Sequence, residues 1–314
     1  MKSTLSLTLL IILTSFFCNG CNSASNSTDG NESVTKDTVA VEELSNDSIP
    51  PRQYQDETIT IATFNIQIFG RTKISKPEIV QRLVELVRKY DIVAIQEFKD
   101  ASGETPIKFL EEVNEGNSVQ YAFRLSPRTG LQDDDRSSME QYGYYYNTET
   151  IEYLNSEMLY DDSQSDLFQR EPFLAQFKAK NGNFTFVLSN IHTRPESAVE
   201  EIGALHNVIE WAKVQFPDEE DFITLGDFNA GCNYASPEEL NNLEFRGREY
   251  VWIVPDSADT NFSTNTECAY DRIVLTTGGE EDFTGEWGID YSIDDTDISD
   301  HFPVWARFKI INDD

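Results

Sequence analysis

Two polar side chains, Asp227 and Asn229, follow an apolar run over residues 222–225. Such a run is typical of a buried strand, so polar residues placed just after it lie at the carboxyl end of that strand. A carboxylate and a carboxamide on one rim can hold a divalent metal ion, a water molecule and a phosphate oxygen together. Taken alone, the Gly-Asp-x-Asn spacing is equally compatible with a simple turn.

Polar residues recur at the ends of other apolar runs. Two of the three histidines, His192 and His301, stand at such positions, whereas His206 lies within a helical pattern and is interpreted as an ordinary helix residue. The other residues of this kind are Asn65, Glu97 and Asp300. Each one singly is compatible with a solvated loop, but their recurrence indicates a shared site.

This set of residues suits the hydrolysis of a phosphate ester. A phosphodiester is an anion that repels hydroxide, and Mg²⁺ or Mn²⁺ held by Glu97 and Asp227 would neutralise charge that develops on its oxygens. Imidazole titrates near neutral pH, so one histidine can act as a base and the other as an acid. Asn65 and Asn229 would add neutral donors to the phosphate oxygens.

The hydrophobic pattern predicts the elements that position these residues. Strand patterns dominate, and helical spacing marks residues 78–90 and 197–214. Strands are expected at residues 58–64, 91–95, 144–147, 173–177, 184–191, 222–225, 270–275 and 303–308. The 314 residues contain no internal repeat, so the simplest interpretation is one α/β domain over residues 57–312.

The composition excludes one class of binding protein. The formal net charge is −32 and 39% of the residues are hydrophobic, which permits a sizeable core beneath a strongly acidic surface. Such a surface repels polyanions at low salt, so nucleic-acid binding through a basic patch is not supported. An anionic substrate would require divalent cations to offset this repulsion locally.

The amino-terminal region predicts export. Residues 1–21 combine a basic start with an apolar core too short to span a bilayer, as in a signal peptide. The segment ends in a sequence that resembles a bacterial lipobox, with Cys21 as the lipidated residue that would anchor the protein to a membrane; an ordinary secretory signal is the alternative. Residues 22–56 are polar and aperiodic, which predicts a disordered tether. We therefore expect a cell-envelope or secreted protein.

Only two cysteines lie beyond residue 21, Cys232 and Cys268. In an exported protein a lone pair of this kind is typical of a disulfide bond. Their polar neighbours are carboxylates and amides, which argues against a thiolate metal site.

The motifs together resemble the endonuclease/exonuclease/phosphatase superfamily, and within it the deoxyribonuclease I family. The resemblance runs in consistent order from about residue 58 to residue 309. It is carried by TFNIQIFG (63–70), IQE (95–97), FQREP (168–172), GDFNAGC (226–232), IVPDSADT (253–260), CAYDRI (268–273) and SDH (299–301).

The resemblance implies an α/β four-layer sandwich of two packed mixed β-sheets flanked by helices. It also implies a monomer that hydrolyses DNA with a divalent metal and little sequence specificity. His192 and His301 would form the acid/base pair, with Glu140 and Asp271 as their orienting carboxylates. Arg170 matches the family's phosphate-contacting arginine. The implied metal and phosphate ligands are Asn65, Glu97, Asp227, Asn229 and Asp300.

Two positions depart from the family pattern. Lys99 stands where the family has an arginine that enters the DNA minor groove, and Ser138 stands where it has a tyrosine that packs on a sugar. Both departures weaken the expected groove contact and leave the preference between single and double strands open. The family's smaller disulfide is missing, whereas the larger one corresponds to Cys232 and Cys268.

The resemblance also implies two structural Ca²⁺ sites built from hard oxygen ligands. The candidates for the first are Asp259, Thr264 and Thr266, in a loop one residue longer than usual. The candidates for the second are Asp166, Glu171, a carbonyl near Phe168, and Asp161 or Asp162. Solvated acidic loops are the alternative for both.

Two other functions remain open. The first is a phosphodiesterase or phosphatase of the same superfamily that acts on lipids or small phosphoesters, and the altered groove contacts favour it. The second is a non-catalytic binding module. The intact set of His192, His301, Glu97, Asp227 and Asp300 argues against that second possibility.

Overall fold

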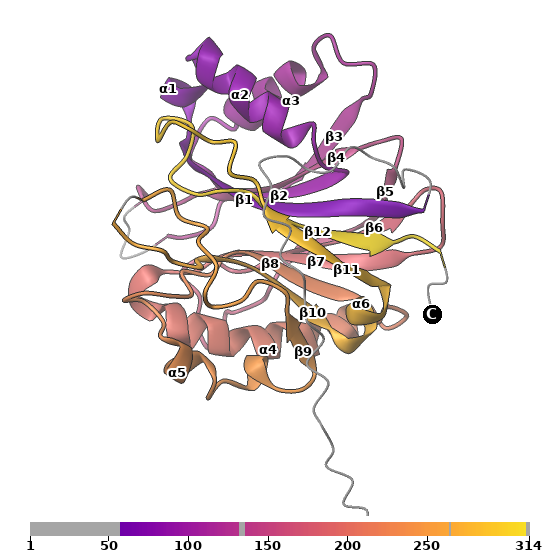
Figure 1. The fold of residues 1–314 in the computed structure, drawn as a ribbon, viewed down its shortest axis with the longest axis vertical. Coiled ribbons are helices and arrows are strands. Elements are labelled where there is room, and N and C mark those ends of the chain that lie inside the picture. Colours follow the sequence, from indigo (N-terminus) through magenta and orange to yellow (C-terminus); the bar gives the residue numbers. More distant parts are fainter. Residues whose placement is uncertain (1–56, 132–135, 264, 312–314) are drawn as a thin grey trace, which may run out of the picture. The chain divides into compact units, whose positions relative to one another are not determined.

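The computed structural model describes residues 57–131, 136–263 and 265–311 (Figure 1). The export signal, the lipidation of Cys21 and the tether at residues 22–56 fall outside these ranges, as does Thr264. Within the described ranges, no helix has the combination of length and apolarity that a membrane span requires.

Twelve strands form two mixed sheets. The first sheet contains β1 (Thr58–Phe69), β2 (Ile92–Phe98), β3 (Tyr121–Leu125), β4 (Gln141–Asn147), β11 (Phe283–Ile289) and β12 (Val304–Lys309). The second contains β5 (Ile151–Leu159), β6 (Phe173–Ala179), β7 (Thr185–His192), β8 (Phe222–Asp227), β9 (Tyr250–Trp252) and β10 (Asp271–Thr276). The strand orders are β11-β12-β1-β2-β4-β3 and β5-β6-β7-β8-β10-β9.

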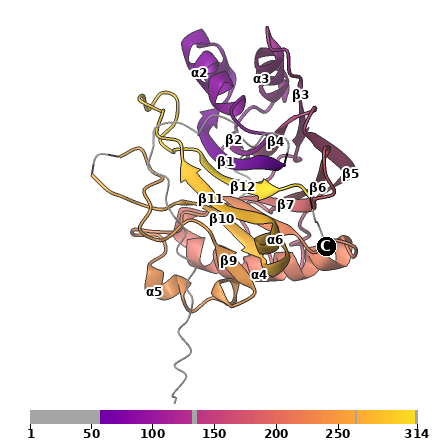
Figure 2. The ribbon, with the colours of Figure 1, turned by 45° about the vertical axis from the view of Figure 1, so that its right-hand side comes forward.

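Helices cover the outer face of each sheet, so the predicted four-layer sandwich is confirmed (Figures 1 and 2). The first sheet carries α1 (Arg71–Ile74), α2 (Pro77–Val87) and α3 (Glu104–Asn114). The second carries α4 (Ala198–Gln215) and α5 (Pro237–Leu240). The remaining helical elements are α6 (Thr277–Asp282) and the 3₁₀ turns η1 (Pro195–Ser197) and η2 (Glu244–Arg246).

Strand β8 shows why the central strands are continuously apolar. Ile223 and Leu225 belong to the core between the sheets, whereas Phe222 packs in the cluster beneath α4. Both faces of the strand are therefore buried, and a polar residue in its interior would lose its hydration. Apart from the hydroxyl of buried Thr224, the polar side chain of β8 lies where the strand ends, at Asp227.

The topology brings the carboxyl ends of two parallel strand pairs to one edge of the sandwich. Strands β1 and β2 are parallel, with Asn65 beside Gln96. Strands β7 and β8 are parallel, with His192 beside Asp227. Each sheet therefore delivers residues at or near the carboxyl ends of its central pair to the same region.

Antiparallel neighbours start at that edge and add further polar residues to it. Strand β10 begins at Asp271, which pairs with Asp227 at the end of β8. Glu140 stands immediately before β4, which pairs with the end of β2. His301 precedes β12, whose first residue lies opposite Thr63 of β1.

The structure also contains elements that the sequence pattern did not predict: the helices α1, α3, α5 and α6 and the strands β3, β5, β9 and β11. Strand β5 lies at the edge of the sheet, beside β6. Exposed residues such as Glu152 and Glu157 interrupt its partly buried residues. A half-exposed edge strand has no continuous apolar run, so its signal is weak. The expected helix over 78–90 ends at Val87, and the strand expected over 58–64 continues to Phe69.

The predicted disulfide between Cys232 and Cys268 is present, with a Cα–Cα distance of 5.7 Å. The two residues are 36 positions apart, and the loop that they close contains Asp259.

Candidate active site

Two histidine–carboxylate pairs face each other at the edge of the sandwich. His192 Nδ1 lies 2.8 Å from Glu140 Oε1, and His301 Nδ1 lies 2.8 Å from Asp271 Oδ2. Each pair joins a residue of one sheet to a residue of the other, because Glu140 and His301 border the first sheet while His192 and Asp271 belong to the second. The packing of the two sheets therefore positions both pairs.

A single carboxylate lies between the two rings. Asp227 Oδ2 is 3.5 Å from His192 Nε2 and 3.5 Å from His301 Nε2. With Nδ1 engaged by a carboxylate, Nε2 of each ring is left to exchange a proton with a bound group. The geometry can therefore hold two proton-transfer groups on either side of one reacting centre.

The two pairs differ in their charged neighbours. Burial and the Arg170 guanidinium lower the pKa of His192, but Glu140 and Asp227 outweigh them, so the net pKa is raised. Burial also lowers the pKa of His301, yet Asp271, Asp227 and Asp300 outweigh burial and raise it well above the usual value. His301 thus holds its proton more firmly than His192.

The carboxylates respond in opposite directions. Burial raises the pKa of Asp227, but the two histidines outweigh it and the net pKa is lowered. The pKa of Asp271 is raised, because burial exceeds the stabilisation by His301. Imidazole is the more basic partner, so the proton shared by the His301–Asp271 pair resides on the ring.

Asn65 and Glu97 complete, together with Asp227, a set of hard oxygen donors. Asn65 Nδ2 donates to Glu97 Oε1 at 3.2 Å and to Asp227 Oδ2 at 3.0 Å, so both carboxylates converge on one amide. The two negative charges are held close together at a place where Glu97 remains partly open to solvent. This donor set fits a divalent ion of the Mg²⁺ or Mn²⁺ type.

Asn229 and Asp300 lie at the margin of this set. The backbone N–H of Asn229 donates to Asp227 Oδ1 at 2.9 Å, and its side chain donates to Thr193 O at 3.0 Å. Asp300 Oδ1 lies 4.0 Å from His301 Nε2, and its side chain is 47% exposed. The structure thus brings together all the residues that the resemblance implied as catalytic groups or metal and phosphate ligands.

Arg170 and Lys99 are engaged with protein groups rather than with open solvent. Arg170 is buried and donates to the carbonyls of His192 and Thr193, each at 2.9 Å. Lys99 Nζ lies 3.7 Å from Glu97 Oε2 and 3.8 Å from Glu140 Oε2. The hydroxyl of Ser138 donates to Gly130 O. Contact of these side chains with a substrate remains a prediction.

The sequence interpretation missed a buried pair of amides beneath the site. Gln96 Nε2 donates to Asn190 Oδ1 at 2.7 Å, and Asn190 Nδ2 donates to Ile95 O at 3.2 Å. These bonds join β2 to β7 one residue before Glu97 and two residues before His192. The spacing of polar residues inside two apolar strands is the signal that could have revealed them.

Lys73 is a second residue that the sequence interpretation missed. Its Nζ donates to the carbonyls of Ile66 and Gln67, each at 2.8 Å, although it lies in a polar stretch that is typical of an exposed helix. Gln67 and Ile68 both have φ of 48°, in the left-handed region that is uncommon for residues with a β-carbon. This conformation directs the Ile68 N–H to Glu97 Oε2 at 2.7 Å. Lys73 therefore holds the strained segment that positions Glu97.

We expect Lys73→Met to lower turnover roughly tenfold and to raise the divalent-ion concentration needed for half-maximal activity, because loss of the two bonds frees the segment and displaces Glu97. Assays of phosphodiester hydrolysis over a range of Mg²⁺ concentrations measure both effects. Lys76→Met is the matched control, since Lys76 forms an ion pair with exposed Asp297 at the surface. Unchanged turnover and ion dependence in Lys73→Met would remove this positioning role.

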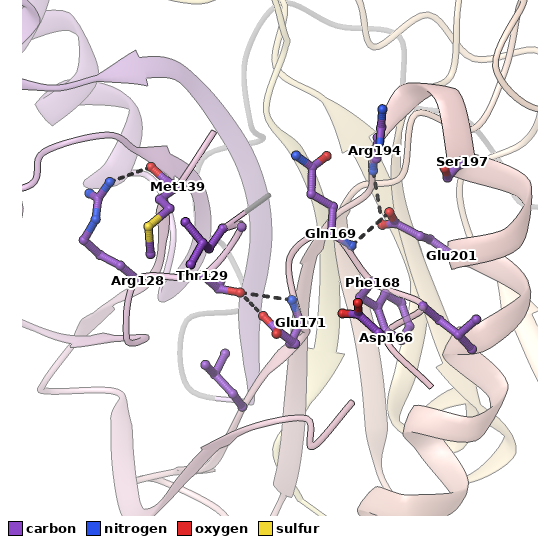
Figure 3. A pocket seen from close by; sticks show the side chains of 14 residues that line it. Arg128, Thr129, Met139, Asp166, Phe168, Gln169, Glu171, Arg194, Ser197 and Glu201 are labelled. Atoms are coloured by element: carbon purple, nitrogen blue, oxygen red, sulfur yellow. Dashed lines mark hydrogen bonds between the residues drawn. The ribbon is translucent and has the colours of Figure 1, made fainter. Parts of the chain in front are cut away.

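A cavity of about 650 Å³ lies between the loop that precedes β4 and the start of α4 (Figure 3). Its wall includes Glu201, which accepts the backbone N–H of Gln169 at 3.2 Å and that of Arg194 at 3.1 Å. These bonds tie the loop that carries Arg170 to the loop that follows His192. The side chain of Glu201 thus stabilises the two loops that adjoin Arg170 and His192.

The stability contributed by Glu201 is expected to depend on pH. Burial raises its pKa to about 7, while unfolded glutamate titrates near ~4.3. Between these two pKa values the folded state therefore binds more protons than the unfolded state. The stabilisation that results is complete below the unfolded pKa and is lost as the pH rises through the folded pKa. From pH ~4 to pH ~8, the unfolding free energy of the wild type should therefore fall by on the order of 3 kcal/mol relative to that of Glu201→Gln.

Urea denaturation of both proteins across this range measures the shift. Glu200→Gln changes an exposed glutamate on the same helix and serves as the control. Parallel stability curves for wild type and Glu201→Gln would contradict the assignment.

The second candidate calcium site lies along the same cavity. Glu171 contacts the Thr129 hydroxyl, and burial together with the charges of Asp162 and Asp166 raises its pKa. Asp162 Oδ2 accepts the Phe168 N–H at 2.7 Å. Binding of Ca²⁺ by these carboxylates remains a prediction.

At the first candidate site, Asp259 Oδ1 accepts the N–H groups of Asn261 at 3.3 Å and Cys268 at 3.2 Å. The Asn261 side chain also donates to Thr266 Oγ1 at 3.2 Å. Asp259 and Thr266 therefore border the same asparagine.

Comparison with known proteins identifies the family of the chain. Residues 62–301 match the endonuclease/exonuclease/phosphatase family. Deoxyribonuclease-1 of Mus musculus is 34% identical over 273 residues, covering 81% of this chain and 93% of that protein. Deoxyribonuclease gamma of Mus musculus is 32% identical over 273 residues, covering 80% and 84%. An endonuclease/exonuclease/phosphatase structure from Bacteroides vulgatus aligns with a TM-score of 0.57 at 17% identity, covering 81% of this chain and 99% of that one.

The chain therefore belongs to the endonuclease/exonuclease/phosphatase family of hydrolases. Its sequence similarity places it among the deoxyribonuclease I-like endonucleases of that family. The Bacteroides vulgatus structure, at 17% identity, supports the fold alone.

Proposed function

We propose that the protein is an exported, divalent-metal-dependent endonuclease that hydrolyses phosphodiester bonds of DNA with little sequence specificity. The observation that carries the proposal is the placement of both histidine Nε2 atoms 3.5 Å from one Asp227 oxygen. In-line hydrolysis needs a base for the entering water and an acid for the leaving oxygen, on opposite sides of one phosphorus atom. The similarity to Deoxyribonuclease-1 supports DNA as the substrate.

In this mechanism the two histidines divide the proton transfers. His192 accepts a proton from water, and Glu140 stabilises the imidazolium that results. His301, held protonated by Asp271, donates to the leaving oxygen. Asn65 and Asn229 would donate to phosphate oxygens and orient them, and Asn65 would exchange one of its bonds to Glu97 or Asp227 to do so. A divalent ion bound by Glu97 and Asp227 would supply charge neutralisation at the phosphate.

The proposal includes structural and cellular features as well. Ca²⁺ would bind near Asp166 and Glu171 and near Asp259 and Thr266, and it would stabilise those acidic loops. A lipid on Cys21 would anchor a monomeric protein to the cell envelope. A secretory signal without lipid is the alternative form of export.

A second candidate function is hydrolysis of phosphate esters other than DNA. Lys99 is held between Glu97 and Glu140, and Ser138 has no aromatic ring to place on a sugar. Both features weaken the engagement of a DNA groove. A smaller phosphoester would not depend on these contacts.

One comparison of substrates separates the two candidates. The purified protein is incubated with supercoiled plasmid, with sphingomyelin and with phosphoinositides, in Mg²⁺, in Mn²⁺ and in excess EDTA. We expect nicking of the plasmid that EDTA abolishes. Release of product from the lipids without plasmid nicking would replace DNA as the substrate, and cleavage in excess EDTA would remove the metal from the mechanism.

A further inference from the structure

A cluster of potential metal ligands lies on α4, and none of its members belongs to the candidate active site. His206 and Glu210 stand one helical turn apart, and Glu249 immediately precedes β9. A ring nitrogen of His206 and one carboxylate oxygen from each glutamate lie within 4.8 Å of one another. Glu244 of η2 lies beside this set, with its Oε2 3.7 Å from His206 Nε2.

The imidazole of this cluster is oriented by a buried neighbour. His206 Nδ1 lies 2.7 Å from the Tyr250 hydroxyl, and Tyr250 is only 8% exposed. The ring of Phe245 packs on Tyr250 with a centroid distance of 4.6 Å, which fixes the phenol in place. Histidines that bind metals characteristically have their second ring nitrogen held in this way.

The Tyr250 hydroxyl can accept the Nδ1–H of His206. The lone pair of Nε2 is then free on the side of the ring where Glu244 lies.

We propose that His206, Glu210 and Glu249 bind a divalent transition-metal ion of the zinc class, with Glu244 as an additional carboxylate ligand. An imidazole nitrogen favours Zn²⁺ over Mg²⁺ or Ca²⁺, which prefer sites made only of oxygen. Glu210 Oε1 also lies 2.7 Å from Lys213 Nζ, but this exposed i,i+3 pair competes weakly with a dication.

The ion would join parts of the chain that are distant in sequence. Helix α4 packs on the second sheet, which carries His192 and Asp227, whereas Glu249 and Glu244 belong to the segment that leads into β9. A ligand that binds only the folded state stabilises it in proportion to its concentration. The site would therefore strengthen the attachment of this segment to α4 without taking part in hydrolysis.

The test compares zinc binding by the purified full-length protein with that of His206→Ala. Both are freed of metal, kept in millimolar Mg²⁺, and titrated with Zn²⁺ by calorimetry. We expect His206→Ala to bind one equivalent less than wild type and to lose the rise in melting temperature that Zn²⁺ gives the wild type. Co²⁺ in place of Zn²⁺ should give a d–d absorption band that the variant loses. Zinc bound at the active site is common to both proteins, so it cancels in the difference.

Glu200→Gln, an exposed substitution on the same helix, is the matched control and should behave as wild type. Glu210→Gln combined with Glu249→Gln provides a second variant in exposed positions, in case His206→Ala fails to fold. Plasmid nicking in Mg²⁺ without zinc should stay within twofold of wild type in every variant, which separates this test from that of the proposed function. Equal zinc stoichiometry in wild type and in the folded variants would overturn the proposal.

Discussion

Replacement of His192 or His301 by alanine is expected to lower turnover at least ~100-fold, the scale typical of losing a general acid or base. Each ring is held by a carboxylate at 2.8 Å, and each presents Nε2 to the same Asp227 oxygen at 3.5 Å. No other imidazole can substitute, because the third histidine, His206, lies in the separate cluster on α4.

The measurement is the rate of plasmid nicking under saturating Mg²⁺, with circular dichroism to confirm that each variant is folded. His206→Ala in zinc-free buffer is the matched control, since it removes an imidazole without touching the candidate active site. The expected losses should also appear in Glu140→Gln and Asp271→Asn, to a smaller extent, because these variants keep the ring but not its charged partner. A variant at 192 or 301 that retains near wild-type turnover would exclude that histidine from proton transfer.

The sequence predicts the part of this site that lies on central strands. Asp227 and His192 follow mainly apolar runs, and such runs occur because β7 and β8 are buried on both faces. The end of each run therefore marks the edge where polar groups become acceptable. The parallel pairing of β7 and β8 then places these two residues side by side.

Other parts of the site have no such signal. Glu140 lies between a polar loop and β4, and only its pairing with a histidine fifty-two positions away shows its orientation. Lys73 has the sequence context of an exposed helix, yet it is buried where the carbonyls of Ile66 and Gln67 accept its ammonium group, next to the strained backbone of Gln67 and Ile68. Contacts of this kind depend on the packing of whole elements, which local periodicity does not encode.

The role of Arg170 illustrates the same limit. Its motif matches a phosphate-contacting residue, but the side chain lies behind His192, where it donates to two backbone carbonyls and approaches Glu140 at 3.6 Å. In this position it competes with His192 for the charge of Glu140. A motif thus identifies the residue, while its contacts decide whether it acts on the substrate or on the histidine.

Loss of the divalent ion is expected to have the largest effect of all, with nicking reduced to background in excess EDTA. Glu97 and Asp227 hold two negative charges against one Asn65 amide, at 3.2 and 3.0 Å, and an anionic phosphate would be repelled from that place without a cation. The formal net charge of −32 adds to the repulsion. Glu97→Gln should therefore retain the fold but need a several-fold higher Mg²⁺ concentration for half-maximal activity, because one anionic ligand is lost.

Titration of nicking activity with Mg²⁺ in wild type, Glu97→Gln and Glu85→Gln measures this shift. Glu85 is an exposed glutamate on α2, so its substitution controls for the loss of one surface charge. Asp227→Asn should shift the curve further and also lower the maximum, because Asp227 borders both histidines as well as the amide of Asn65. Superimposable Mg²⁺ curves for wild type and Glu97→Gln would show that Glu97 does not bind the ion, and the convergence of the two carboxylates would then serve only to orient Asn65.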